Sequence, residues 1–160
     1  THLNVITGDQ ATNSSYPDID TELGRLGYDR SNPIHVANAV IRVRRRKLPD
    51  PRFIGNVGSF FKNPLLSLRA FEQLRGKIDV QGFAEGKLVK VSAARLIDAS
   101  GWKGFQDGAV AVWHRQPLVL INTGGATASN VLGLAERIVE DVQRRYGVML
   151  EREPIELGSP

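Results

Sequence analysis

One short stretch of this 160-residue sequence concentrates the side chains best suited to chemistry. Residues 55–64 read Gly-Asn-Val-Gly-Ser-Phe-Phe-Lys-Asn-Pro, with Ser59 directly after the second glycine. Glycine adopts backbone conformations that a Cβ atom would forbid, so Gly55 and Gly58 can bend the chain and present Ser59 at a surface. The plain alternative is an ordinary loop that enters an apolar strand.

Proton transfer is the chemistry that these residue types permit. A serine hydroxyl is a very weak acid, so it donates a proton only to a strongly basic centre such as a carbanion or an enolate. A carboxylic acid beside that centre could hold or donate a proton, and lysines with an asparagine could bind phosphate oxygens. The residues therefore allow, without requiring it, reduction or proton transfer next to a carboxylate on a phosphate-bearing substrate.

Several other chemistries are disfavoured. Phe61 stands two residues after Ser59, where the nucleophile turn of a hydrolase needs glycine. The sequence has no G-x-G-x-x-G, and Gly124-Gly125 lacks the Lys-Ser/Thr pair of a phosphate loop, so an ordinary strand-to-helix turn is expected there. The three histidines lack the spacing of metal ligands, so no metal site is predicted. The absence of cysteine excludes disulfides and thiolate chemistry.

Alternating helical and extended patterns must position these groups. Helices are predicted at 33–46, 67–76, 92–100 and 127–146, and strands at 78–83, 88–91, 109–113, 118–121 and 148–153. Pro154 ends the last strand and leaves Glu153 at its end, where side chains often line a site. The irregular alternation and the hairpin predict an α+β fold with a mixed or antiparallel sheet and packed helices.

The domain organisation is expected to be simple. Residues 1–30 are rich in turn-forming residues and are expected to be a loose, loop-like segment with at most a short helical turn at 21–23. Residues 31–160 should form one compact α+β domain, since 41% of the sequence is hydrophobic and the apolar residues are spread along it. No apolar run approaches the roughly 20 residues that span a bilayer, so no membrane partner is expected.

The net charge of +4 comes largely from one basic run at 42–47. A basic run at the end of a helix is more often a solvated face that interacts favourably with the helix dipole than a binding site. The run could also bind an anionic ligand or nucleic acid. No series of exposed aromatic residues accompanies it, which disfavours a nucleic-acid partner.

Several motifs follow one another along the sequence: Lys-Leu-Pro-Asp-Pro at 47–51, the stretch at 55–64, Ala-Arg-Leu-Ile-Asp at 94–98, Lys-Gly at 103–104, Ala-Val-Trp-His-Arg-Gln at 111–116, Leu-Val-Leu-Ile-Asn at 118–122 and Leu-Glu-Arg-Glu at 150–153. In this order they resemble the MurB family of UDP-N-acetylenolpyruvoylglucosamine reductases in its carboxy-terminal, substrate-binding part. The resemblance extends from about Tyr16 onward.

The resemblance implies roles for individual residues. Ser59 would donate a proton to the carbon next to the substrate carboxylate, and Glu153, with Glu151 as the alternative, would stabilise or protonate the enolate-like intermediate. Four further residues would contact the nucleotide: three would hold the diphosphate and one tyrosine would close over the nucleotide. These are Lys47, Asn63, Lys103 and Tyr16.

The resemblance also implies partners and a location. The intact enzyme would be cytoplasmic and would use NADPH and FAD to reduce the enolpyruvyl group of a UDP-sugar in peptidoglycan synthesis. The family's FAD-binding domain would precede Thr1, so this chain alone is expected to bind no flavin and to be inactive. The alternatives are a non-catalytic module that binds nucleotide sugars and a small basic domain that binds nucleic acid.

Overall fold

The computed structural model describes residues 17–153, in two units that divide between Arg46 and Lys47. The first unit contains helix α1 (Pro17–Leu26) and almost all of helix α2 (Pro33–Lys47). The expected loop at 1–30 is therefore wrong over the ten residues of α1. Asp18 and Asp20 in its first turn favour the helix through its dipole, and Pro17 is tolerated at its first position. The assignment of 31–160 to one domain stays a prediction.

A buried carboxylate stabilises this helical unit. The Glu22 side chain is 2% exposed and accepts hydrogen bonds from Arg25 Nη2 (2.7 Å) and Arg46 Nη1 (2.9 Å). The hydrogen bond from Arg25, followed by that from Arg46, lowers the pKa of Glu22 to about 2. A buried carboxylate is stable only when it is paired in this way. Glu22 therefore links the α1 helix to the end of α2.

The second unit is built on a four-stranded antiparallel sheet with the order β1-β7-β6-β5. Its strands are β1 (Gly55–Ser59), β5 (Gln106–Asp107), β6 (Val110–Val112) and β7 (Val119–Asn122). Side chains alternate between its faces. Val110, Val112 and Leu120 pack in the main core, whereas Ala111, Val119 and Ile121 form a second cluster with Leu48, Ile54 and Trp113. This pairing confirms the predicted hairpin at 109–121 and the α+β class.

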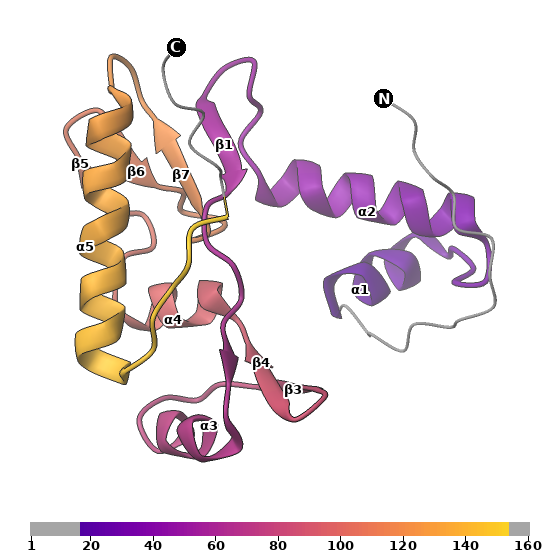
Figure 1. Cartoon of the computed structure of the whole chain (residues 1–160). Helices are drawn as coiled ribbons and strands as arrows, with labels where there is room; N and C mark the ends of the chain where they lie inside the picture. The colour runs from indigo at the N-terminus through magenta and orange to yellow at the C-terminus, as the bar shows by residue number, and fades with distance from the viewer. Residues whose placement is uncertain (1–16, 154–160) are drawn as a thin grey trace, which may run out of the picture. The chain divides into compact units, whose positions relative to one another are not determined.

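Helix α5 (Ala128–Tyr146) covers the main-core face of this sheet and contacts β6 and β7 (Figure 1). Thr127, where the helix was predicted to begin, caps it through a reciprocal pair of hydrogen bonds with Asn130. Gly147 ends it in the left-handed conformation (φ 72°). The buried side chains of α5 recur at helical spacing: Leu134, Ala135, Ile138, Asp141 and Val142.

A smaller antiparallel sheet, with the order β2-β4-β3, and two short helices complete the second unit. Its elements are β2 (Leu65–Leu66), α3 (Leu68–Arg75), β3 (Gly82–Glu85), β4 (Leu88–Val91) and α4 (Ala93–Ala99). Ser67 and Ser92, the residues at which these helices were predicted to begin, cap the two helices. None of the helices within residues 17–153 combines the length and the apolar composition that a membrane span requires.

Three extended segments differ from prediction. The strand expected at 78–83 forms only at Gly82–Glu85. The stretch at 55–64, where no strand was predicted, contains strand β1, whose ladder shifts register between Asn56 and Ser59, with Gly58 at a φ of 78°. The strand expected at 148–153 is reduced to one bridge, between Phe61 and Arg152. Val148 and Leu150 are buried, but in the described part of the segment only residues 151–153 form backbone hydrogen bonds with a neighbouring segment, residues 60–62. The alternating pattern therefore indicates burial at 148–150 and pairing only at 151–153.

Candidate functional site

The two predicted catalytic residues, Ser59 and Glu153, lie on neighbouring segments. Ser59 is exposed at the end of β1. The next residue, Phe60, accepts a hydrogen bond at its carbonyl from the Glu153 N–H (2.8 Å), and the Lys62 N–H donates to the Glu151 carbonyl (2.9 Å). Residues 89 or more apart in sequence thus meet at one end of the four-stranded sheet. The exposed Glu153 side chain is available to solvent or ligand there.

The same end of the sheet continues from Ser59 across β7 to Trp113. Ser59 lies opposite Val119 in the β1–β7 ladder, and directly opposite residues share a face of the sheet. The Trp113 N–H donates to the Val119 carbonyl (2.8 Å). This register places Ser59 on the face where Trp113 packs against Val119.

Lys47 is tied to this end by the Trp113 side chain. The indole Nε1 donates a hydrogen bond to the Lys47 carbonyl (2.9 Å), and Leu48, the next residue, packs in the cluster of Val119 and Trp113. The hydrogen bond from Trp113 holds the Lys47 backbone in place. Because Lys47 is only half-buried, its side chain remains partly accessible. The backbone of Lys47, the predicted diphosphate lysine, therefore lies on the same face of the sheet as Ser59.

Lys103 lies in a tight loop at the same end. Gly101 and Gly104 both have positive φ values (84° and 77°), and the Gly104 N–H donates to the Val112 carbonyl (3.2 Å) at the end of β6. Lys103 Nζ lies 3.6 Å from Asp98 Oδ2, and both side chains are 40% exposed. Such an exposed ion pair is weak, so the ammonium group can exchange this partner for a ligand anion.

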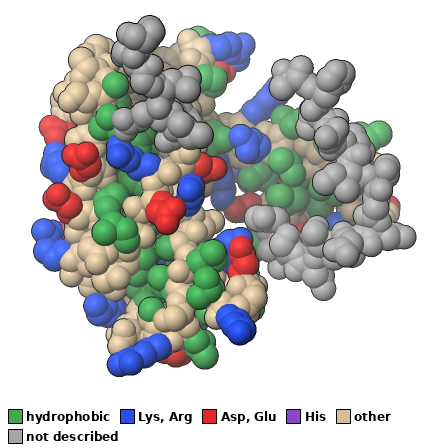
Figure 2. Space-filling model, in the orientation of Figure 1, with side chains coloured by type: hydrophobic (Ala, Val, Ile, Leu, Met, Phe, Trp, Pro, Cys, Tyr) green, Lys and Arg blue, Asp and Glu red, His purple; other side chains and the backbone are tan. Residues whose placement is uncertain are grey.

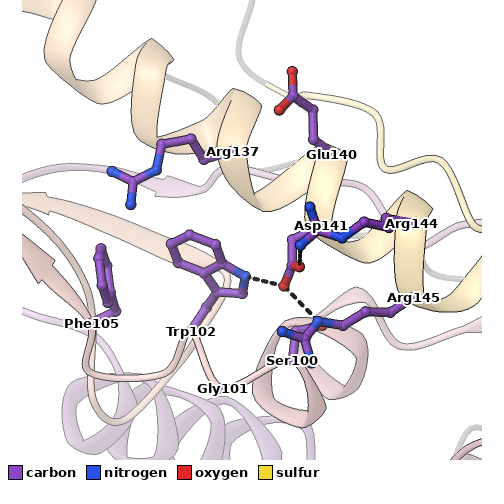
Figure 3. A pocket seen from close by; sticks show the side chains of 9 residues that line it. All are labelled: Ser100, Gly101, Trp102, Phe105, Arg137, Glu140, Asp141, Arg144 and Arg145. Carbon is purple, nitrogen blue, oxygen red and sulfur yellow. Dashed lines mark hydrogen bonds and ion pairs between the residues drawn. The ribbon is translucent and has the colours of Figure 1, made fainter.

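A buried aspartate anchors this loop to α5 (Figure 3). Asp141 Oδ2 accepts hydrogen bonds from Trp102 Nε1 (3.0 Å) and Arg145 Nε (2.8 Å), and Asp141 also pairs with Arg144. Burial acts to raise the pKa of Asp141, but the hydrogen bonds from Arg145 and Trp102 and the charges of both arginines outweigh it, so the pKa lies below its ordinary value. Arg137 lies over the Trp102 ring (5.5 Å). Asp141, Arg144 and Arg145, which line the surrounding cavity of about 410 Å³, are thus engaged with one another, which indicates a role in stability and not in ligand binding.

Asn63 has a structural partner already. Its Oδ1 accepts a hydrogen bond from the N–H of Ala93, the first residue of α4 (2.9 Å). Asn63 also lines a cavity of about 410 Å³ between residues 62–66 and 147–151, across which Lys62 Nζ and Glu151 Oε2 lie 3.4 Å apart. Asn63 can contact a ligand only through the part of its amide that remains exposed.

The face of the protein in view in Figure 2 carries hydrophobic, basic and acidic side chains side by side.

The sequence also singled out Tyr16 and the basic run at 42–47. Tyr16 lies outside the described residues. The basic run lies mainly on α2, where Arg42 and Arg45 line a cavity of about 540 Å³ together with the paired Glu22. Among the described residues, no group of three His, Asp or Glu side chains is placed to hold a metal ion.

Trp113 is the residue of this site that the sequence did not identify. It stood in the strand predicted at 109–113 and was given no role of its own. Its indole N–H reaches the carbonyl of a residue 66 positions away. No local pattern predicts such a contact, because it depends on how the segment at 47–54 returns over the sheet.

Comparisons with known proteins agree with this arrangement of motifs. The family described as "UDP-N-acetylenolpyruvoylglucosamine reductase, C-terminal domain" matches residues 50–157. The chain belongs to this family. A Burkholderia ambifaria protein named UDP-N-acetylenolpyruvoylglucosamine reductase is 48% identical over 144 residues, which are 88% of this chain and 41% of that protein. A Pseudomonas aeruginosa protein of the same name is 54% identical over 122 residues, 74% of this chain and 36% of that protein.

The chain thus spans about two fifths of the length of these relatives of the reductase family. The family match at 50–157 includes Ser59, Asn63, Lys103 and Glu153, and Lys47 lies just before it.

A flavin, which the reductase family implies, does not fit the strand-to-helix loop of this chain. Dinucleotide phosphates bind free backbone N–H groups at such loops. Here Asn122 Oδ1 accepts from the N–H groups of Gly124 (2.8 Å) and Ala126 (3.1 Å), and Thr127 Oγ1 accepts from Asn130 N–H (3.2 Å). Protein acceptors therefore already use the donors that a diphosphate would need.

Proposed function

We propose that this chain supplies the substrate-binding part of a UDP-N-acetylenolpyruvoylglucosamine reductase. The complete reaction would convert UDP-N-acetylglucosamine enolpyruvate to UDP-N-acetylmuramate with NADPH and FAD. The observation that carries the proposal is the meeting of the Ser59 and Glu153 segments, through the 2.8 Å hydrogen bond at Phe60, at one end of the sheet. The expected cytoplasmic location and the flavin-binding partner domain are parts of the same proposal.

Ser59 and Glu153 would manage the proton of the reaction. Reduction of an enolpyruvyl double bond leaves an enolate-like centre next to the carboxylate, and this centre is basic enough to take a proton from a serine hydroxyl. The Ser59 hydroxyl would donate that proton to the carbon. The Glu153 carboxyl group would stabilise or protonate the enolate-like intermediate as its negative charge develops.

The lysines would bind the diphosphate of the substrate. The Lys47 carbonyl accepts a hydrogen bond from Trp113, Lys103 lies in the loop bonded to Val112, and both lysine side chains are partly exposed. Ammonium groups form strong charge-assisted hydrogen bonds to phosphate oxygens. The exposed part of Asn63 would add a contact, and Tyr16 would close over the nucleotide.

Ser59→Ala tests the catalytic part of this proposal. The variant should lower kcat by about 10²–10⁴-fold with little change in KM, since a general acid contributes to the transition state and not to ground-state binding. Turnover would be measured in the reductase with its flavin-binding domain present. Ser129→Ala is the matched control, because Ser129 is exposed at the start of α5, beyond the opposite end of β7.

Different outcomes separate the alternatives. Full turnover in Ser59→Ala would show that the hydroxyl has no catalytic role. Tight binding of the UDP-sugar without any turnover in the flavin-bearing protein would favour a non-catalytic nucleotide-sugar module. Affinity for polynucleotides that falls steeply with salt, without affinity for the UDP-sugar, would favour the nucleic-acid alternative.

A further inference from the structure

We infer that Trp113 is a positioning residue for the nucleotide diphosphate, acting through Lys47. The inference rests on the proposed function, because it assigns Trp113 a role in the binding of the same substrate. Trp113 would fix the backbone from which the Lys47 side chain extends and so determine where the ammonium group can lie.

The hydrogen bond to Lys47 satisfies a group that helix geometry leaves free. Lys47 is the last residue of α2, and the final carbonyl groups of a helix have no partner within the helix. The Trp113 Nε1–H donates to this carbonyl at 2.9 Å. An open carbonyl carries partial negative charge and would repel a neighbouring phosphate, so pairing it with an indole N–H also removes an unfavourable charge.

The indole is itself held firmly in place. The Trp113 backbone N–H donates a hydrogen bond to the Val119 carbonyl at 2.8 Å. This bond fixes Trp113 beside Val119, the residue opposite Ser59 in the β1–β7 ladder. Its side chain packs in the second hydrophobic cluster, together with Leu48 and Ile54 from the segment that follows Lys47. Trp113 is therefore held at its backbone by the sheet and at its ring by the segment that carries the lysine.

A second contact connects Trp113 with the loop that carries Lys103. The His114 ring lies 4.3 Å from the Trp113 ring, centroid to centroid. A Cβ atom at Gly104 would lie 3.7 Å from His114 Cβ, so the loop passes directly beside this histidine. The Trp113–His114 pair thus lies between the segments of both predicted diphosphate lysines, with its direct hydrogen bond on the Lys47 side.

A double-mutant cycle distinguishes positioning from a purely structural role. Trp113→Phe removes the indole N–H and keeps an aromatic ring, and Lys47→Met removes the charge and keeps the aliphatic chain. The affinity for UDP-N-acetylmuramate would be measured by calorimetry for the two single variants, the double variant and the unsubstituted protein. Lys47→Met should weaken binding about tenfold, the value of one charge-assisted hydrogen bond.

The expected result is strong coupling between the two substitutions. Trp113→Phe should weaken binding about three- to tenfold when Lys47 is present and less than twofold in the Lys47→Met background. Trp102→Phe is the matched control, since it removes the other indole N–H, which donates to Asp141 at 3.0 Å. Its effect on affinity should be the same with and without Lys47.

The possible failures are distinguishable. Unchanged affinity in Lys47→Met, or no binding of the nucleotide sugar by the unsubstituted protein, would contradict the proposed function and the inference together. If Lys47→Met weakens binding but Trp113→Phe does not, or if the two effects simply add, the inference alone is wrong.

Discussion

Replacement of Gly82 by alanine should destabilise the second unit measurably. The added Cβ atom would lie 2.4 Å from Val89 Cγ1 and 2.5 Å from Phe71 Cζ. Carbon atoms pack at about 3.5–4.0 Å, so these side chains must move by about 1 Å. Phe71 is 9% exposed and belongs to the main core, which leaves it little room. Overpacking of this kind should cost about 2 kcal/mol and lower the melting midpoint by about 4–8 °C.

Gly133→Ala makes the same chemical change where space is available. Gly133 lies inside α5, and an added Cβ atom there meets no atom within 4 Å. Alanine favours a helix over glycine by about 0.5–1 kcal/mol, so this variant should melt higher than the unsubstituted protein. Thermal unfolding followed by circular dichroism would compare the two. Equal or greater stability of Gly82→Ala would refute the packing argument, as would a shift of both variants in the same direction.

Two further predictions concern the buried carboxylates. Asp141→Ala removes the acceptor of the Trp102 indole and should lower the free energy of unfolding by about 1–3 kcal/mol in urea titrations, whereas Glu140→Ala, at an exposed neighbour, should change it by less than about 0.5 kcal/mol. Equal effects of these two variants would contradict the anchoring role of Asp141. The folded pKa of Glu22 is about 2 and its ordinary value is 4.5, so its stabilising effect is complete above about pH 4.5 and is lost as the pH falls toward 2. Glu22→Gln should weaken this acid dependence in a helicity titration, and an identical acid transition in both proteins would be evidence against it.

Local signals in the sequence predicted most of the individual elements. Caps such as Ser67 and Ser92 and the stop at Gly147 act within one helical turn, so their residues alone define where helices begin or end. The α1 helix was missed because turn-forming residues surround it, and its buried Glu22 depends on Arg46, a partner 24 positions away. Tertiary ion pairs of this kind leave no local pattern.

The site shows the same division between local and distant information. The sequence singled out Ser59 and Glu153 through a motif resemblance, but their proximity depends on hydrogen bonds between residues 60–62 and 151–153. Alternation at 148–153 predicted a full strand, although only one bridge forms. The role of the Trp113 indole depends on chain return and could not be predicted from its neighbours.

The binding site of the nucleotide sugar tests the central claim most directly. Backbone amide resonances of the protein would be followed by NMR during titration with UDP-N-acetylmuramate. The account predicts that the largest shifts fall at the sheet end, around Lys47, Ser59, Lys103, Trp113 and Glu153. Saturable shifts confined to the arginine-lined cavity of the helical unit, or no shifts at millimolar ligand, would contradict it.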